Sequence, residues 1–188
     1  MDHSDHVDLI RGGVVPGVWA DLGSGAGAFT LALADLLGPG ARIVSVDRDG
    51  GALRRQRQAM EARFPAAGVE YLQADFTRPL GLPPLDGVVM ANSLHFVHRK
   101  PPVLALVTGL LRPGGRLVLV EYDTDRGNPW VPHPLAYPTW ERVAAENGLV
   151  GTRLLARHPS RVLGAIYSAL SLRPPPDSAD TRTRRQPG

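Results

Sequence analysis

The chain has 188 residues, of which 43% are hydrophobic and 21% are charged, and it contains no cysteine. This length suits one domain with a sizeable core. The absence of cysteine excludes a disulfide scaffold, a cysteine-ligated metal centre and a thiol nucleophile. No apolar run reaches the roughly 18 residues needed to span a bilayer, and the N-terminus lacks the basic region of a secretion signal. We therefore expect a soluble, cytoplasmic protein with no membrane partner.

The excess of basic over acidic residues, 21 against 18, comes mainly from the C-terminal end of the chain. Residues 173–188 hold four arginines and two aspartates: Arg173, Arg182, Arg184, Arg185, Asp177 and Asp180. The preceding residues 1–172 carry 17 basic and 16 acidic groups and are nearly neutral. The charge therefore gives little support to a nucleic-acid partner.

Segments typical of strands and of helices alternate along the first half of the chain. Short apolar runs predict strands, and amphipathic runs that stop at Gly or Pro predict helices. The expected strands are residues 18–22, 42–46, 69–73 and 86–91. The expected helices are residues 28–37 and 52–64. Strands that alternate with helices favour a parallel sheet covered on both faces.

The second half begins with a predicted helix at 101–111, a turn at 112–115 and a strand at 116–122. Residues 123–138 contain several prolines, which remove the backbone donors that a helix or central strand needs, so we expect a Pro-rich lid or acceptor loop. A helix at 139–147 follows. Strands at 152–157 and 161–170 are joined by only three residues, which is too short for a parallel crossover and predicts an antiparallel hairpin.

These elements predict an α/β fold with a doubly wound, mostly parallel, Rossmann-like sheet of seven strands and a C-terminal antiparallel hairpin. We expect residues 1–172 to form a single domain in which 1–17 is an N-terminal segment, and residues 173–188 to be a disordered tail. The alternating Asp and His at residues 2–8 fit a solvated tail better than a metal site, and we expect no metal.

The sequence Asp21-Leu-Gly-Ser-Gly-Ala-Gly27 joins the first strand to the first predicted helix. Such a loop presents backbone N–H groups at a helix N-terminus, where they can meet a carboxylate or phosphate. Asp47, at the end of the next strand, can accept hydrogen bonds from two ribose hydroxyls, although it could also be only a helix cap. These residues indicate an adenosine-type cofactor, and a nicotinamide dinucleotide remains open at this point.

Five segments in chain order resemble the class I S-adenosylmethionine-dependent methyltransferases, over roughly residues 18–170. They are the glycine loop, Asp47, Ala74-Asp75-Phe76, the strand from Asp86 to Asn92, and the turn Leu111-Arg-Pro-Gly-Gly-Arg-Leu117. The terminal hairpin is similar to the family's antiparallel seventh strand beside the fifth. The resemblance implies S-adenosyl-L-methionine as cofactor, held by Asp21, Gly23, Ser24, Gly25, Gly27, Asp47, Arg48, Asp75, Phe76 and Asn92.

His95 follows the fourth strand and is the first candidate for a general base, because an imidazole titrates near neutrality. A packing role for His95 is the alternative. His95, Tyr122, Trp130 and His133 are the expected acceptor pocket. The Asn-Pro-Pro-Tyr type of segment found in amino-methylating nucleic-acid enzymes is absent after the fourth strand, which favours a small-molecule acceptor. Methylation of O, N or C stays open.

Three other functions remain open from the sequence. A nicotinamide-dependent Rossmann oxidoreductase would share the fold and part of the glycine pattern. A non-catalytic S-adenosylmethionine-binding protein would keep the cofactor residues without turnover. A nucleic-acid methyltransferase would use Arg182, Arg184 and Arg185 in a salt-dependent manner. The chain is expected to be a monomer or a homodimer.

Overall fold

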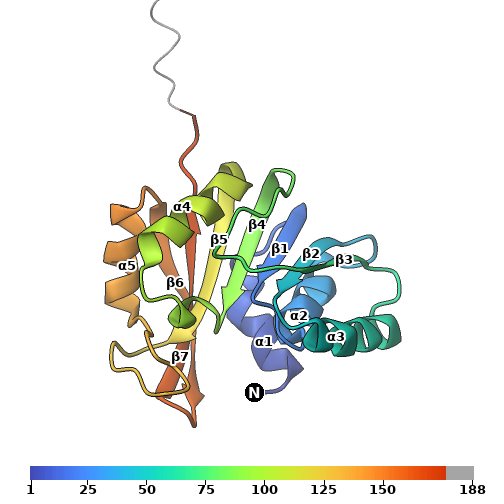
Figure 1. Cartoon of the computed structure of the whole chain (residues 1–188), viewed down its shortest axis with the longest axis horizontal. Coiled ribbons are helices and arrows are strands. Elements are labelled where there is room, and N and C mark those ends of the chain that lie inside the picture. The colour runs from blue at the N-terminus through green and yellow to red at the C-terminus, as the bar shows by residue number, and fades with distance from the viewer. Residues whose placement is uncertain (177–188) are drawn as a thin grey trace, which may run out of the picture.

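The computed structural model describes residues 1–176, which form a seven-stranded sheet with helices on both faces (Figure 1). The sequence-based expectation of a doubly wound sheet is confirmed. The elements in chain order are α1 (His3–Arg11), β1 (Val18–Leu22), α2 (Ala28–Leu37), β2 (Arg42–Asp47), α3 (Gly50–Arg63), β3 (Gly68–Gln73), β4 (Leu85–Ala91), the 3₁₀ helix η1 (Leu94–Phe96), α4 (Lys100–Leu110), β5 (Leu111–Tyr122), α5 (Tyr137–Glu146), β6 (Val150–Ser160) and β7 (Gly164–Leu172).

The strands lie in the order β3-β2-β1-β4-β5-β7-β6. The first five are parallel to one another, and β7 pairs antiparallel with both β5 and β6. The strand order reverses between β1 and β4, so the loops that follow these two strands diverge to opposite faces. A crevice forms at such a point, and it is where parallel α/β sheets bind ligands.

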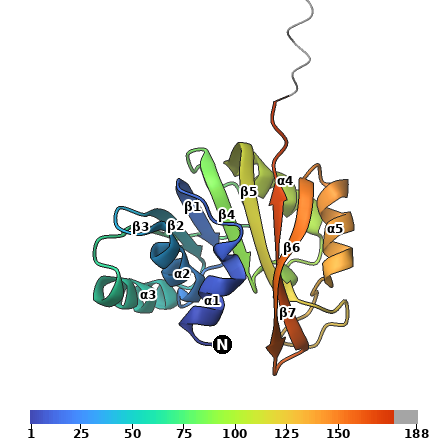
Figure 2. The same ribbon diagram turned by 180° about the vertical axis from the view of Figure 1, so that it is seen from behind.

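Two buried clusters of side chains fill the space between the sheet and its helices. The cluster on one face includes residues of α1, α2 and α3, such as Ile10, Leu33 and Met60. The cluster on the other face includes residues of α4 and α5, such as Leu104 and Trp140. The two opposite views show the helices arranged in this way (Figures 1 and 2). Because both faces are covered, the central strands are apolar almost throughout.

The N-terminal residues form a helix, and the expectation of a solvated tail at residues 2–8 is wrong. Asp2 and Asp5 make a reciprocal capping box that starts α1. Val7, Leu9 and Ile10 are buried, and α1 packs against α2. Residues 2–8 contain a single apolar residue, Val7, so the buried side of the helix becomes apparent only when Leu9 and Ile10 are included.

The C-terminal hairpin forms as expected, but its turn lies at residues 161–163. The expected connection, residues 158–160, belongs to β6. Pro159 is tolerated there because β6 is an edge strand and needs no donor on its outer side. The helix expected at 139–147 begins earlier, at Tyr137, so it takes the last two residues of the predicted Pro-rich loop.

Residues 112–115, the expected turn, belong to the start of β5, where the pairing with β4 shifts register. The disordered tail was expected to begin at residue 173, but Arg173 is bonded to the folded domain. Its amide donates to the Gly115 carbonyl (2.9 Å), and its guanidinium donates to the carbonyls of Thr108 and Leu111. Residues 177–188, with the remaining arginines of the predicted tail, lie outside the described residues. Within residues 1–176, no helix combines the length and apolarity required to traverse a bilayer.

Candidate functional site

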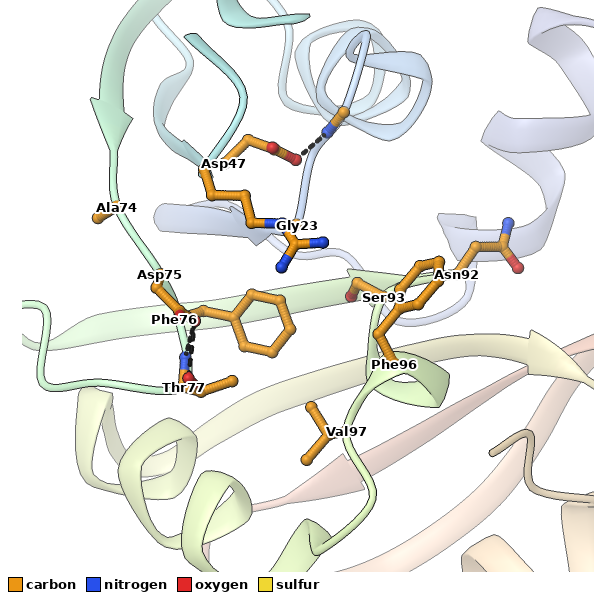
Figure 3. Close-up of a pocket in the computed structure, with 12 residues that line it drawn as sticks. Gly23, Asp47, Ala74, Asp75, Phe76, Thr77, Asn92, Ser93, Phe96 and Val97 are labelled. Carbon is orange, nitrogen blue, oxygen red and sulfur yellow. Dashed lines mark hydrogen bonds between the residues drawn. The ribbon is translucent and has the colours of Figure 1, made fainter. Parts of the chain in front are cut away.

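A cavity of about 530 Å³ opens where β1, β2, β3 and β4 end, at the point where the strand order reverses. Its wall comes from the loop after each of these strands, which explains why residues far apart in sequence meet there (Figure 3). Twelve residues line it: Gly23, Gly25, Asp47, Arg48, Ala74, Asp75, Phe76, Thr77, Asn92, Ser93, Phe96 and Val97.

The glycine loop forms the floor of the cavity. Because glycine has no side chain, the loop can pack closely against its neighbours. The Gly23 and Ser24 amides donate to the Val46 carbonyl at 2.8 and 3.1 Å, which ties the loop to β2. Gly23 has φ +79°, and a Cβ there would come within 2.5 Å of the Ser93 Cβ. Gly25 also has a positive φ, +54°, but a Cβ there would meet no atom within 4 Å. Open space over Gly25 leaves its backbone accessible to a ligand.

Asp47 joins the end of β2 to the glycine loop. Its Oδ2 accepts a hydrogen bond from the Gly25 amide at 2.7 Å (Figure 3). Its Oδ1 accepts one from the Asp49 amide at 2.8 Å. The helix cap of α3 is Asp49, whose Oδ1 accepts from the Gly51 amide. The carboxylate of Asp47 is therefore oriented by two amides while it lines the cavity, and the capping role considered for it belongs to another residue.

The segment after β3 contributes an aromatic ring to the opposite wall. Asp75 Oδ1 accepts from the Thr77 amide (2.9 Å) and hydroxyl (2.7 Å), and these hydrogen bonds lower the pKa of the Asp75 carboxyl. The resulting turn directs the Phe76 side chain into the cavity, between Asp47 and Phe96 (Figure 3). Phe76 thus presents a flat apolar surface of the kind that a purine can stack on.

Three of the predicted cofactor residues do not line the cavity. Asp21 is buried and accepts a hydrogen bond from the Thr30 hydroxyl at 2.6 Å. Ser24 lies in a buried hydrogen-bonded group with Ser45 and Gln56. Gly27 has φ +91° and packs against the side chain of Gln56. The three residues support the loop from below. The other seven, Gly23, Gly25, Asp47, Arg48, Asp75, Phe76 and Asn92, lie on the cavity wall.

Burial raises the pKa of Asp21 to about 7, and the hydrogen bond from Thr30 only partly opposes this effect. The nearby charge of Asp47 raises the pKa further. The carboxyl of Asp21 therefore titrates near neutrality because it is buried beneath the loop.

Several wall residues were missed in the sequence, although some belong to segments quoted for other reasons. Ser93 is buried and donates to the Leu22 carbonyl at 2.7 Å, which links the end of β4 to the end of β1. Phe96 is 59% exposed at the mouth of the cavity. The 3₁₀ helix η1 turns Phe96 outward and His95 inward. A single 3₁₀ turn has no periodicity that a sequence reveals.

His95, the predicted base, is only 3% exposed and is absent from the cavity wall. Its Nδ1 lies 2.9 and 3.1 Å from the two carboxylate oxygens of Glu121, a residue of β5 with no exposed surface. The ring centroid of Phe96 lies 4.3 Å from that of His95, so Phe96 stands beside it at the cavity mouth. The structure therefore pairs His95 with a carboxylate that the sequence did not single out.

None of the other predicted acceptor residues lines the cavity. Tyr122 lies next to His95, with ring centroids 5.9 Å apart. Trp130 is 78% exposed on the Pro-rich segment. The His133 ring contacts that of His98, and partial desolvation lowers the pKa of His133. The structure therefore brings His95 and Tyr122 together but does not assemble the expected acceptor pocket of four side chains, because Trp130 is exposed and the His133 ring faces His98.

The wall residues fit an adenosine-containing amino acid such as S-adenosylmethionine. The open backbone at Gly25, the oriented carboxylate of Asp47 and the ring of Phe76 match an amino-acid, a ribose and a purine group in turn. Asn92 adopts φ +51°, and its Oδ1 is buried with no hydrogen-bond partner within residues 1–176. An unpaired buried acceptor at a cavity wall is costly unless a ligand supplies the donor.

Comparison with known proteins gives the class. Residues 20–119, more than half of the chain, match the family described as methyltransferase domain. The chain belongs to this family, in the class I S-adenosylmethionine-dependent methyltransferases, which confirms the resemblance noted in the sequence. The matched region contains the glycine loop and the cavity wall.

Among curated relatives, the ubiquinone/menaquinone biosynthesis C-methyltransferase UbiE of Ectopseudomonas mendocina is 32% identical over 110 residues, 58% of this chain and 43% of the relative. The chain thus spans less than half of the length of this relative. Two solved structures share the fold. YcgJ of Bacillus subtilis has a TM-score of 0.74 at 12% identity and covers 93% of this chain and 100% of its own. The N-methyltransferase NodS of Bradyrhizobium japonicum has a TM-score of 0.69 at 20% identity, covering 92% and 94%.

Proposed function

We propose that this chain transfers the methyl group of S-adenosylmethionine to a carbon atom of a small organic acceptor that loses a proton in the reaction. The observation that carries this proposal is the buried His95–Glu121 pair beside the cavity mouth. A neutral amine already carries a lone pair, whereas a carbon acid or hydroxyl must lose a proton to become a good nucleophile. The name of the UbiE relative, a C-methyltransferase, supports carbon over oxygen.

The cavity wall has a separate task in this proposal, which is to hold the cofactor. Asp47 accepts ribose hydroxyls, Phe76 packs on the adenine, and the open space over Gly25 receives the amino-acid part of the cofactor. Asp21 stays beneath the loop and supports its conformation. When bound, S-adenosylmethionine supplies a methyl group made electrophilic by the positive sulfur. Holding donor and acceptor in line can supply about 7–11 kcal/mol of the rate enhancement.

His95 is suited to accept the proton at Nε2, because its Nδ1 is engaged with Glu121. The buried carboxylate orients the ring and stabilises the imidazolium that forms. With S-adenosylmethionine bound, Nε2 of His95 would accept the proton that the acceptor carbon loses, and the cofactor would supply the methyl group that this carbon takes up. His95 is buried, and the exposed side chain of Phe96 packs beside it at the mouth. Rotation of Phe96 therefore opens the path by which the acceptor reaches His95.

A screen of small carbon acids and phenols with S-adenosylmethionine tests the proposal. We expect a product heavier by one methylene group and an equal amount of S-adenosylhomocysteine. With the identified acceptor, His95→Gln and Glu121→Gln should each lower kcat, His95→Gln by about 10²–10⁴-fold as expected for loss of a general base. His98→Gln, which alters an exposed histidine three residues away, is the control and should retain turnover.

Two results would count against this proposal. Wild-type turnover by His95→Gln would remove the base from the mechanism. Binding of S-adenosylhomocysteine without turnover of any acceptor would favour a non-catalytic cofactor-binding protein. A nucleic-acid acceptor would instead give methylated RNA or DNA in the same assay.

A further inference from the structure

The Pro-rich segment between β5 and α5 is held at both of its ends. Asp123 Oδ1 accepts from the Tyr137 amide at 2.9 Å, and Asp125 Oδ1 accepts from the Ala136 amide at 3.0 Å. The second oxygen of Asp125 accepts from the Thr139 hydroxyl at 2.9 Å. Both aspartates thus satisfy donors at the start of α5, where acidic groups are favourable. These hydrogen bonds join the first residues of the segment to its last residues.

A third attachment, in the middle of the segment, connects it to the loop after β4. The His133 amide donates to the His95 carbonyl at 3.0 Å. The His133 carbonyl accepts from Lys100 Nζ at 2.9 Å, and the same ammonium donates to the Val97 carbonyl at 2.9 Å. The main-chain N–H and C=O of one residue of the Pro-rich segment, His133, are therefore both bonded to residues between 95 and 100.

Lys100 is the only lysine in the chain, and it is 8% exposed. Burial lowers the pKa of Lys100, and the charge of Glu121 partly opposes this shift. A buried ammonium is costly compared with an apolar side chain of the same length, so its retention calls for a local benefit. At this place the ammonium fixes two main-chain carbonyls, those of Val97 and His133.

We propose that Lys100 is a positioning residue of the methyl-transfer site, because its ammonium latches His133 onto the loop after β4 and thereby fixes the main chain of His95. This inference rests on the proposed function for the identity of the reaction, but the latch itself is a structural claim. Lys100 itself does not line the cavity, and its ammonium reaches the wall only at the main chain of Val97, which is not one of the expected cofactor residues. Its loss should therefore disturb the geometry of His95 and leave the cofactor residues in place.

Hydrogen exchange of the His133 amide tests the latch without any substrate. In the wild-type chain this amide should exchange much more slowly than the Arg126 amide of the same segment, which donates to an exposed Thr124 hydroxyl. Lys100→Met keeps the side-chain length and removes the charge, and it should speed exchange at His133 by about 10–100-fold. Arg99→Met removes an equal charge from an exposed neighbour and should change nothing there.

The kinetic readout separates positioning from a general loss of stability. With an acceptor in hand, Lys100→Met should lower kcat at least tenfold while the KM for S-adenosylmethionine and the Kd of S-adenosylhomocysteine stay within twofold. Fast exchange at His133 in the wild-type chain, or unchanged exchange in Lys100→Met, would overturn the latch. If Lys100→Met does not fold, exchange at His133 as fast as at Arg126 in the wild-type chain would still overturn the latch. Failure of the proposed function would show separately, as absent turnover with the exchange pattern intact.

Discussion

At Gly25, the addition of a single methyl group should have separable effects on ligand binding and on the stability of the fold. Its φ of +54° disfavours alanine, but a Cβ would point into open space on the cavity wall. We expect Gly25→Ala to weaken S-adenosylhomocysteine binding at least tenfold, because the methyl group occupies ligand space, and to lower the free energy of unfolding by about 1–2 kcal/mol. Calorimetric titration and urea unfolding measure the two effects.

Gly148→Ala is the matched control for this substitution. Gly148 has φ +78°, its Cβ would also meet no atom within 4 Å, and it lies outside the cavity wall. It should therefore lose a similar amount of stability and no affinity. Equal affinities for the two variants would mean that the open space over Gly25 is not used by the cofactor.

Asp21 gives a prediction on pH. Its pKa is about 7 when folded, against 3.8 for the ordinary group, so between about pH 4 and pH 7 the folded state keeps a proton that the unfolded state has released. The contribution of Asp21 to stability is therefore largest near pH 4 and falls as pH rises to 7, by at most roughly 4 kcal/mol. Urea unfolding across this range should show the wild-type chain losing stability relative to Asp21→Asn. Parallel curves for the two proteins would contradict the raised pKa, and the exposed-site variant Asp8→Asn should follow the wild type.

At the scale of elements, α1 is the one whose contribution is least visible in the sequence. Its docking depends on Leu9 and Ile10, which have no exposed surface, and on the His3–Asp35 contact of 2.9 Å with α2. Ile10→Ala should lower the free energy of unfolding by about 2–5 kcal/mol. Asp8→Ala, on the exposed side of the same helix, should change it by less than about 0.5 kcal/mol. An unchanged urea midpoint for Ile10→Ala would show that α1 is not docked in solution.

The elements that could be predicted are those whose signal is local. The apolar runs of β1, β4 and β5 and the Gly and Pro residues that end the helices identify a doubly wound sheet. The turn of the final hairpin could not be placed, because Pro159 looks like a turn residue and is accommodated only by the open edge of β6. Likewise, α1 needs its partner helix to reveal which side is buried.

At the scale of the whole molecule, most residues of the cavity wall were predictable from the sequence, and the buried partners of His95 and His133 were not. Asp47 and Phe76 each end a strand or follow one, and the parallel sheet necessarily brings such positions to one edge. Glu121 and Lys100 act through contacts with residues 26 and 33 positions away, His95 and His133. In the sequence they look like an ordinary strand end and helix start, so only the tertiary structure reveals their roles.

Calorimetric titration of the wild-type chain with S-adenosylhomocysteine and, separately, with NAD is the most direct test of the central claim. We predict one site for S-adenosylhomocysteine with micromolar or tighter affinity and no measurable NAD binding. Asp47→Ala should weaken that affinity by about 10–150-fold, as expected for loss of hydrogen bonds to a charged group, with the fold intact by circular dichroism. Binding of NAD without binding of S-adenosylhomocysteine would contradict the account.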